Sequence, residues 1–374
     1  MPVEPFALER YFAVHEFSAK YLLCASDCES LTIGELLAFE PGSEEQLLGM
    51  GLGYTESAGA PWLRDEIARL YTTLDASDVL VHTGAEEALF LFYQALVTPG
   101  DHVIVQTPCY QSALSVPRSL GCEVTEWECR YERDWEPDFA ELERAVRGNT
   151  RVLYINSPHN PTGFHFNQEI LIRILRLADE RGVVVFSDEV YRELEHEPGL
   201  PLPAACDLSA QAVSLGVMSK TYGLPGLRIG WLGTRNRRVV QAVAGAKDYT
   251  TICNSAPSEF LAALALRHRA ELVRRSLSIV HRNLELLDSF FARHGRFLQW
   301  VRPRAGSVAF PRLVLPVDAP TFCSQVVLES GVLLAPGETF ARPGHVRIGF
   351  GRLNMPESLA RLEDYLLTAH QART

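Results

Sequence analysis

The chain has 374 residues, of which 47% are hydrophobic and 22% charged, and its formal net charge is −11. This length can bury a large core and predicts two domains, or one large domain with an appendage. The negative charge argues against nucleic acid or an anionic membrane surface as the main partner and favours a small molecule. The opening run "MPVEPFALERYFAVHEF" has no long apolar stretch, so we expect a cytoplasmic protein without a secretory signal or membrane span. The eight cysteines lack the paired spacing of a metal site and are expected to be reduced thiols.

The first part of the chain alternates short apolar strands with helical patterns. From Pro61, "PWLRDEIARLYTTL" puts Leu63, Ile67, Leu70 and Leu74 on one helical face. The next stretch, "DVLVHTGAEEALFLFYQALVTPGDHVIVQTP", predicts a strand, a glycine turn, an apolar helix and a second strand. Further strands are predicted at 122–128, 151–156, 183–187 and 213–218, with helices at 138–147 and 168–181. This alternation predicts an α/β fold in which helices cover both faces of a mostly parallel sheet, with the ligand crevice at the carboxyl ends of the strands.

After Trp231 the pattern becomes mainly helical. Helices are predicted at 236–248, 256–268 and 270–293, followed by "FLQWVRPRAGSVAFPRLVL", which alternates like antiparallel strands. A helix at 319–330, the short strands "GVLLAP" and "HVRIGFG" and a helix from Pro356 complete the chain. We therefore predict a large domain at 41–270 and a small α+β domain at 271–374, which packs with the N-terminal segment 1–40.

Lysine is rare in this chain. Only Lys20, Lys220 and Lys247 are present, so arginine supplies 32 of the 35 basic residues. Because an ammonium can lose its proton and form a Schiff base, whereas a guanidinium cannot, a retained lysine is a candidate nucleophile. Lys20 and Lys247 are expected at the surface. Lys220 is the candidate, since it follows a predicted strand in "VMSKTYGLPGLRIGW".

Two of the predicted strand ends offer a phosphate site and a flat ring. Gly84 and Ala85 open a helix whose free N–H groups and dipole suit a phosphate, although an ordinary strand-to-helix turn also uses glycine. Tyr110, in "TPCYQS", is placed at the rim, where it either stacks on a flat ligand or packs as a rim tyrosine.

The remaining strand ends supply polar and charged groups. Asn160 lies in "NSPHNPTG", where it serves as an amide donor or only as part of a tight turn. Asp188 and Tyr191 follow the apolar strand of "VVVFSDEVY", and the acid is either the partner of a protonated ring nitrogen or a helix N-cap. Lys220 and Arg228 come from "VMSK" and "GLPGLRIG". Together these groups are what pyridoxal phosphate requires: an imine-forming lysine, a carboxylate for the ring nitrogen, donors to the ring oxygen, a stacking ring and a phosphate cup.

These motifs, in this order, resemble the class I and II aminotransferases of the aspartate aminotransferase superfamily, which are fold type I pyridoxal-phosphate enzymes. The resemblance extends over nearly the whole chain and implies a large domain with a seven-stranded type of sheet, a smaller α+β domain and a homodimer with shared active sites. It implies a role for each motif residue. These are Lys220 as the Schiff-base lysine, Asp188 on the ring nitrogen, Tyr191 and Asn160 on the ring oxygen, Tyr110 as the stacking ring, Gly84, Ala85, Glu86, Ser219 and Arg228 at the phosphate, Tyr54 reaching the partner subunit's phosphate, and Arg347 as the anchor of the substrate carboxylate.

The sequence departs from the family pattern near the phosphate. Val217 stands where relatives have Ser or Gly, so phosphate binding must depend on Ser219, Arg228 and the 84–86 amides, or on Thr251 and Asn254. Glu86 is an acid beside a phosphate nest, and we expect its side chain to turn away.

The N-terminal segment departs too: "CASDCESLTIGELL" replaces a run that reads like "GEPDF" in many relatives. It is similar to that of specialised members acting on guanidino amino acids.

The predicted function is a pyridoxal-phosphate-dependent aminotransferase that acts on an α-amino acid and a keto acid, with Lys220 moving the α-proton. Two alternatives remain open. One is an enzyme of the same fold that cyclises, eliminates from or oxidises an amino acid, including a guanidino one; the other is a catalytically inactive binding module that keeps the fold.

Overall fold

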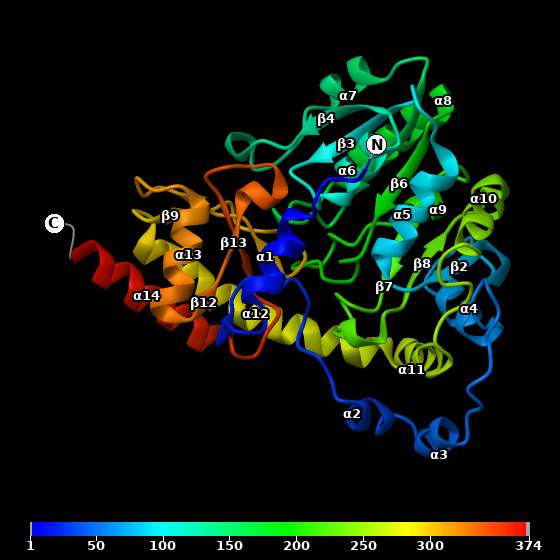
Figure 1. Cartoon of the computed structure of the whole chain (residues 1–374), viewed down its shortest axis with the longest axis horizontal. Coiled ribbons are helices and arrows are strands. Elements are labelled where there is room, and N and C mark those ends of the chain that lie inside the picture. Colours follow the sequence, from blue (N-terminus) through cyan, green and yellow to red (C-terminus); the bar gives the residue numbers. More distant parts are fainter. Residues whose placement is uncertain (1, 372–374) are drawn as a thin grey trace.

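The computed structural model describes residues 2–371, and its centre is a seven-stranded sheet (Figure 1). The strand β8 is antiparallel to both neighbours, and all the other neighbouring pairs are parallel. This confirms the predicted fold class. In sheet order the strands are β2 (Val79–His82), β8 (Gly230–Gly233), β7 (Val213–Val217), β6 (Val184–Asp188), β5 (Thr150–Asn156), β3 (His102–Thr107) and β4 (Glu123–Glu128).

Helices cover both faces of this sheet because its central strands are apolar on both sides. In β3, Val103 and Val105 belong to the hydrophobic cluster that contains α5, whereas Ile104 belongs to the cluster that contains α8. Successive side chains of a strand point to opposite faces, so a continuous apolar run needs two helical layers. The helices of this part are α4 (Pro61–Ala68), α5 (Ala85–Leu96), α6 (Ser112–Ser119), α7 (Phe139–Ala145), α8 (Gln168–Arg181), α9 (Ala205–Leu208), α10 (Arg237–Lys247) and α11 (Ala256–Arg267).

The C-terminal part is built on the 26-residue helix α12 (Arg269–His294), which runs from α11 toward α14 (Figure 1). The predicted strand "GVLLAP" is two short strands interrupted at Leu334. The other elements are β9 (Leu298–Gln299), β10 (Val308–Ala309), β11 (Arg312–Leu313), α13 (Ala319–Ser330), β12 (Val332–Leu333), β13 (Ala335–Pro336), η4 (Gly337–Phe340), β14 (Val346–Gly349) and α14 (Met355–Gln371). The domain boundaries at residues 40 and 270 stay a prediction.

The N-terminal segment lies against this C-terminal part. Its strand β1 (Tyr21–Leu22) pairs in parallel with β12, and Tyr11 donates a hydrogen bond to the carbonyl of Leu334 at 2.8 Å. Two glycines of the "HVRIGFG" motif allow the approach: a Cβ on Gly349 would lie 1.7 Å from the Ala25 carbonyl, and one on Gly351 2.5 Å from that of Asp27. The helices of the segment are α1 (Ala7–His15), α2 (Ile33–Leu37) and α3 (Ser43–Leu48).

The helix predicted from Pro61 is shorter than its apolar pattern. It ends at Ala68, so Leu63 and Ile67 are buried on its inner face as expected, but Leu70 and Leu74 lie outside it. The backbone amides of Thr72 and Thr73 both donate to Asp207 Oδ1 at 2.9 Å, which turns the chain away from the helix. A distant side chain thus overrides the local periodicity.

Lys247 is buried, contrary to the prediction that it lies at the surface. Its side chain is 0% exposed, and Nζ donates to the carbonyls of Ser57 and, at 2.7 Å, Val81. Lys247 is the last residue of α10 and lies on the same helical face as Val239 and Val243. Its two hydrogen bonds connect the segment before α4 to β2.

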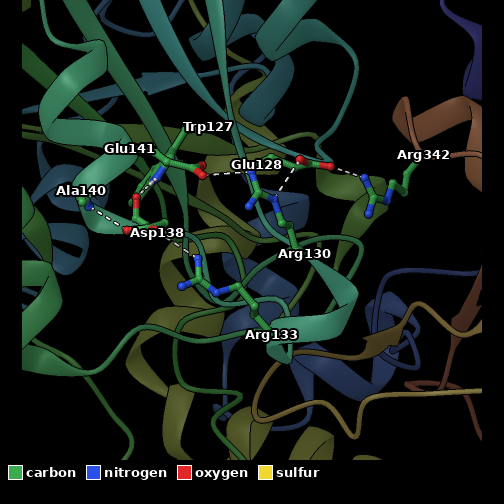
Figure 2. Close-up of polar contacts among 8 residues, drawn as sticks. All are labelled: Trp127, Glu128, Arg130, Arg133, Asp138, Ala140, Glu141 and Arg342. Carbon is green, nitrogen blue, oxygen red and sulfur yellow. Dashed lines mark hydrogen bonds and ion pairs between the residues drawn. The ribbon is translucent and has the colours of Figure 1, made fainter.

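A network of charged side chains joins the edge strand β4 to the C-terminal part (Figure 2). Glu128 accepts hydrogen bonds from Arg130, at 3.2 Å, and from Arg342, which follows η4. Arg130 also donates to Glu141 of α7 at 2.9 Å. The Arg342 and Glu128 side chains are 25% and 39% exposed, so this pair is only partly shielded from water.

Candidate active site

A cavity of about 430 Å³ lies at the carboxyl ends of β5, β6 and β7. It collects residues that the sequence places up to 344 positions apart, from Leu8 to Arg352. The predicted site residues that line it are Ala85, Glu86, Tyr110, Asn160, Asp188, Tyr191, Ser219, Lys220, Arg228 and Arg347. Gly84 and Tyr54 are the two predicted residues that do not line it.

Lys220 follows β7 by three residues, and its side chain is partly buried in the cavity. Nζ donates to Ser26 Oγ at 2.8 Å. Burial lowers the pKa of this ammonium, although the nearby Asp27 carboxylate opposes the shift. An amine with a lowered pKa is more readily deprotonated, which a nucleophile or a proton carrier requires.

Asp188 is the last residue of β6 and faces the same cavity. Its Oδ2 accepts from the Tyr154 hydroxyl at 2.8 Å and its Oδ1 from the Val190 amide at 3.2 Å. Burial raises the pKa of this carboxyl to about 6. The residues after Asp188 form turns and not a helix. The alternative prediction that Asp188 is a helix N-cap is therefore wrong. A protonated ring nitrogen would stabilise its charged form.

Tyr191 and Asn160 provide polar groups beside Lys220. The Tyr191 hydroxyl donates to the Ser26 carbonyl at 3.0 Å, and Asn160 Oδ1 accepts from Arg347 Nη1 at 3.3 Å. Both side chains are buried. They line the cavity, as a pair that contacts a ring oxygen would have to do.

Tyr110 lies at the cavity rim beneath the N-terminal segment. Its hydroxyl donates to Glu9 Oε1 at 2.6 Å, and its ring centroid lies 4.8 Å from that of Phe6. The ring is held by these contacts while it still lines the cavity, so packing at the rim and stacking on a ligand are compatible.

The turn at Gly84 and the side chain of Arg228 form a cradle for an anion. Gly84 has φ +87°, and a Cβ there would lie 2.5 Å from Arg228 Nη2, so only glycine lets the guanidinium approach this closely. Ala85 begins α5, whose unpaired N–H groups carry the positive end of the helix dipole. The site can therefore receive a phosphate, with Ser219 also lining it.

The structure places the residues that depart from the family pattern near the predicted phosphate site. Val217 lines the cavity and is 4% exposed, so it contributes an apolar wall. Thr251 and Asn254 are not among the lining residues, because they bond to Glu87 (2.7 Å) and Glu259 (3.0 Å). The groups at the cavity that remain available to a phosphate are Ser219, Arg228 and the α5 amides.

Glu86 accepts a hydrogen bond from Ser112 Oγ at 3.0 Å, toward the start of α6. Burial raises the pKa of its carboxyl to about 7. A carboxyl with this pKa is about half protonated at neutral pH, so it repels an adjacent phosphate less than an ordinary glutamate would.

Arg347 is 1% exposed and lies in the middle of β14. Nη2 donates to the Cys24 carbonyl at 3.0 Å, whereas Nε has no partner among residues 2–371. A buried guanidinium with an unpaired donor beside a cavity is suited to bind a carboxylate.

Several lining residues were missed by sequence reasoning. Ser26, whose hydroxyl accepts from Lys220 and whose carbonyl accepts from Tyr191, and Asp27, which pairs with Arg352 at 2.7 Å, both come from the atypical segment. Tyr154 lies two residues before the end of β5 and supports Asp188. The glycines of "GFG" were a signal that another chain segment approaches β14 closely.

Comparisons with known proteins agree with this geometry. The model of a family described as aminotransferase class I and II matches residues 23–361. Capreomycidine synthase of Streptomyces vinaceus is 31% identical over 377 residues, covering 100% of this chain and 95% of the relative. Aspartate aminotransferase of Thermotoga maritima is 30% identical over 360 residues, covering 91% of this chain and 92% of the relative.

Solved structures give the same result. A pyridoxal-phosphate-dependent aminotransferase from Streptococcus suis superposes with a TM-score of 0.93 at 34% identity, covering 98% of this chain and 99% of that one. The pyridoxal-phosphate-dependent cyclase OrfR superposes with a TM-score of 0.91 at 29% identity, covering 99% and 98%. The chain therefore belongs to the class I and II aminotransferase family and is an enzyme whose cofactor is pyridoxal phosphate.

Proposed function

We propose that this protein is a homodimeric aminotransferase in which Lys220 carries the cofactor and moves the α-proton of an amino-acid substrate, whose amino group passes to a keto acid. The observation that carries the proposal is the convergence of Lys220, Asp188 and Arg347 on one cavity. These three groups supply an amine, a carboxylate and a carboxylate receptor, which are the requirements of amino-group transfer.

Each residue has a defined task. Pyridoxal phosphate, when bound, supplies an electron sink that stabilises the carbanion left by α-proton removal. Asp188 would hold a proton on the ring nitrogen, Tyr191 and Asn160 would contact the ring oxygen, and Lys220 would accept and return the substrate proton.

The substrate and the phosphate are held by different cations. Arg347, which is 1% exposed, would orient the α-carboxylate through its unpaired Nε–H. Arg228 and the first amides of α5 would hold the phosphate. Their separation fixes both ends of the reacting assembly.

The proposal of an active site shared between two subunits depends on Tyr54. Its side chain is 93% exposed and does not line the cavity of its own chain. Leu52 and Tyr249 are 85% and 93% exposed, so three large apolar side chains are available for burial in a dimer. We propose that Tyr54 contacts the phosphate of the other subunit.

The cytoplasmic location stays a prediction. No helix within residues 2–371 is long and apolar enough to cross a membrane.

A cyclase or another use of the same carbanion is the second candidate. It is favoured by the two whole-chain relatives named as a synthase and a cyclase, and by the atypical segment that places Ser26 on Lys220. Lys220 Nζ and Ser26 Oγ lie 2.8 Å apart, so the hydroxyl of Ser26 is a second group beside the lysine that can exchange a proton with it.

One experiment tests the proposal and separates the candidates. The holoenzyme is mixed with an amino acid in the absence of a keto acid. Stoichiometric conversion of the cofactor to its pyridoxamine form, and renewed turnover when a keto acid is added, support transamination. Repeated turnover without a keto acid, with ammonia release, oxygen uptake or a cyclic product, supports the second candidate. The Lys220→Ala variant should lose the cofactor's lysine-linked absorbance and turnover, and substantial surviving transamination would overturn the assignment.

A further inference from the structure

A second, smaller cavity adjoins the catalytic one. It has a volume of about 90 Å³ and shares Val190 and Val217 with the catalytic cavity, so these two valines form a common wall. Such a volume holds about three water molecules or one small tetrahedral ion. The polar and charged residues that line it are Glu189, Arg192, Glu193, Thr221, Tyr222 and Arg269.

Two of these residues are arginines without a carboxylate partner. Within the described part of the chain, neither Arg192 nor Arg269 forms an ion pair or donates a side-chain hydrogen bond. The Arg192 guanidinium carbon lies 5.3 Å from the centroid of the Tyr71 ring, a contact that holds the side chain without using its N–H groups. A guanidinium has five N–H donors, so both arginines can bind an oxyanion in this cavity.

Two carboxylates line the same cavity and offset part of this positive charge. Glu193 Oε2 accepts a hydrogen bond from the Tyr222 hydroxyl at 2.9 Å. Burial alone would lower the pKa of Arg192, but Glu189, Tyr71 and Glu193 raise it overall, so the guanidinium stays charged. An anion without a hydrogen would therefore meet two arginines and two acids, and its binding would be weak. An anion that also donates a hydrogen to one of the acids would be favoured.

Glu189 provides an acceptor for such a hydrogen. It is 8% exposed, and its Oε1 accepts from the Ala205 amide and the Ser214 hydroxyl, both at 2.8 Å. Its Oε2 has no hydrogen-bond partner within residues 2–371. Burial raises the pKa of this carboxyl, although Arg192 and the donors around it, which include Ser187, oppose the shift. A buried oxygen without a donor is costly, so a ligand that brings a hydrogen to Oε2 would be stabilised.

The two arginines come from different parts of the fold. Arg192 lies in the turn after β6, and the Thr221 hydroxyl donates to its carbonyl at 2.8 Å. Arg269 is the first residue of α12, whose start has no side-chain cap, so the free N–H groups there add positive potential. An anion between Arg192 and Arg269 would therefore connect the sheet to the long helix of the C-terminal part.

We infer that this cavity is a binding site for hydrogen phosphate, which accepts hydrogen bonds from Arg192 and Arg269 and donates its own to Glu189 Oε2. Sulfate has a similar shape but carries no proton at neutral pH, and the dianion of a phosphate monoester carries none either, so both would leave Glu189 unpaired. The site is separate from the cradle at Gly84 and Arg228. The inference goes beyond the proposed function and does not depend on it.

Calorimetry on the holoenzyme tests the inference. The protein is exchanged into a phosphate-free buffer at pH 8 and titrated, at constant ionic strength, with inorganic phosphate, sulfate or methyl phosphate. Inorganic phosphate should bind once per chain with a Kd below about 1 mM, whereas sulfate and methyl phosphate should bind at least about tenfold more weakly. The melting temperature should rise with phosphate and not with the same concentration of sulfate.

Three variants and a control locate the ion. Arg192→Gln and Arg269→Gln should each weaken phosphate binding at least about tenfold. Glu189→Gln places an amide N–H where Oε2 lies, so sulfate should then bind at least as tightly as phosphate. Arg176→Gln is the matched control, since it removes an exposed arginine of α8 that lines neither cavity, and it should leave the Kd within about twofold.

Three results would overturn the inference. One is the absence of saturable phosphate binding below about 10 mM, and another is equal affinity of the wild type for phosphate and sulfate. The third is an unchanged Kd in both Arg192→Gln and Arg269→Gln; if that binding is lost in Arg347→Gln, the ion lies in the catalytic cavity. The proposed function is measured by amino-group transfer to a keto acid in phosphate-free buffer, so its failure is seen independently of these titrations.

Discussion

Lys220 and Lys247 are two lysines removed from water in opposite surroundings. Lys220 ends in a cavity, where Nζ bonds to one hydroxyl and faces the Asp188 and Asp27 carboxylates. Lys247 is 0% exposed and ends on two backbone carbonyls. Burial lowers the pKa of both ammonium groups. The shared shift therefore does not distinguish a reactive lysine from a structural one.

The two lysines differ in their access to the cavity and in whether a ligand can replace their hydrogen-bond partners. The hydroxyl of Ser26 can be exchanged for a ligand, and the cavity gives that ligand room. The carbonyls of Ser57 and Val81 belong to the packed chain and would be left unpaired if Lys247 moved. A buried amine is a candidate for chemistry only when it borders a cavity.

Replacing each lysine by arginine gives the largest contrast. In Lys220→Arg the charge remains but the imine-forming amine is lost, so turnover should fall at least about a thousandfold. Steady-state kinetics measure the loss, and a melting temperature within a few degrees of wild type shows that the fold is intact. Lys247→Arg should keep a measurable rate, since it lies outside the cavity. A Lys220→Arg enzyme that retains a tenth of wild-type turnover would refute the assigned role.

The second prediction concerns stability. Lys247→Met fills a similar volume but leaves two carbonyls without a donor, so the free energy of unfolding should fall by roughly 1–3 kcal/mol. Denaturant unfolding measures the change. Lys20→Met, at an exposed position, is the control and should alter stability by less than about 0.5 kcal/mol. If the two variants were equally stable, Lys247 would not be the tie between α10, β2 and the segment before α4.

The same two lysines show what the sequence could and could not predict. Lys220 and Asp188 were predicted because strand ends and their short motifs are local patterns, and the parallel sheet brings such ends together. Arg347 was predicted only from the resemblance of its motif to the family's, since β14 belongs to a separate sheet. Lys247 was predicted wrongly because its partners come from positions 57 and 81, far from α10. A periodic signal did exist, since Val239, Val243 and Lys247 share one helical face.

Ser26 could not be assigned from sequence for a related reason. Ser26 contacts Lys220 across 194 residues, and the N-terminal segment can approach because Gly349, at the end of β14, and Gly351, just after it, have no side chains. Long-range packing of an irregular segment leaves no period in the sequence. The segment was identified as atypical, but its place in the cavity required the fold.

Glu86 extends the comparison to a carboxyl at the edge of the cavity. Burial raises its pKa to about 7, above its ordinary value of 4.5, so the folded protein holds this proton more tightly than the unfolded chain. The stabilising effect is full below about pH 4.5 and is lost as the pH rises toward 7. Glu86→Gln should therefore be more stable than wild type at pH 8, by roughly 1–2 kcal/mol, with no gain at pH 4. Parallel denaturation at the two pH values measures this; an equal gain at both would show that Glu86 acts through packing and not through its charge.

The smallest effect is expected at Arg342, which shows how little a charged pair contributes when water reaches it. The pair with Glu128 joins β4 to the C-terminal part, but both side chains are partly exposed (Figure 2). Arg342→Gln should lower the free energy of unfolding by only about 0.2–1 kcal/mol, and 1 M salt should reduce the difference further because mobile ions screen the pair. Denaturant unfolding at low and high salt gives both values. A salt-independent loss as large as that of Lys247→Met would mean that this exposed arginine, like the buried lysine, is held by contacts that water cannot replace.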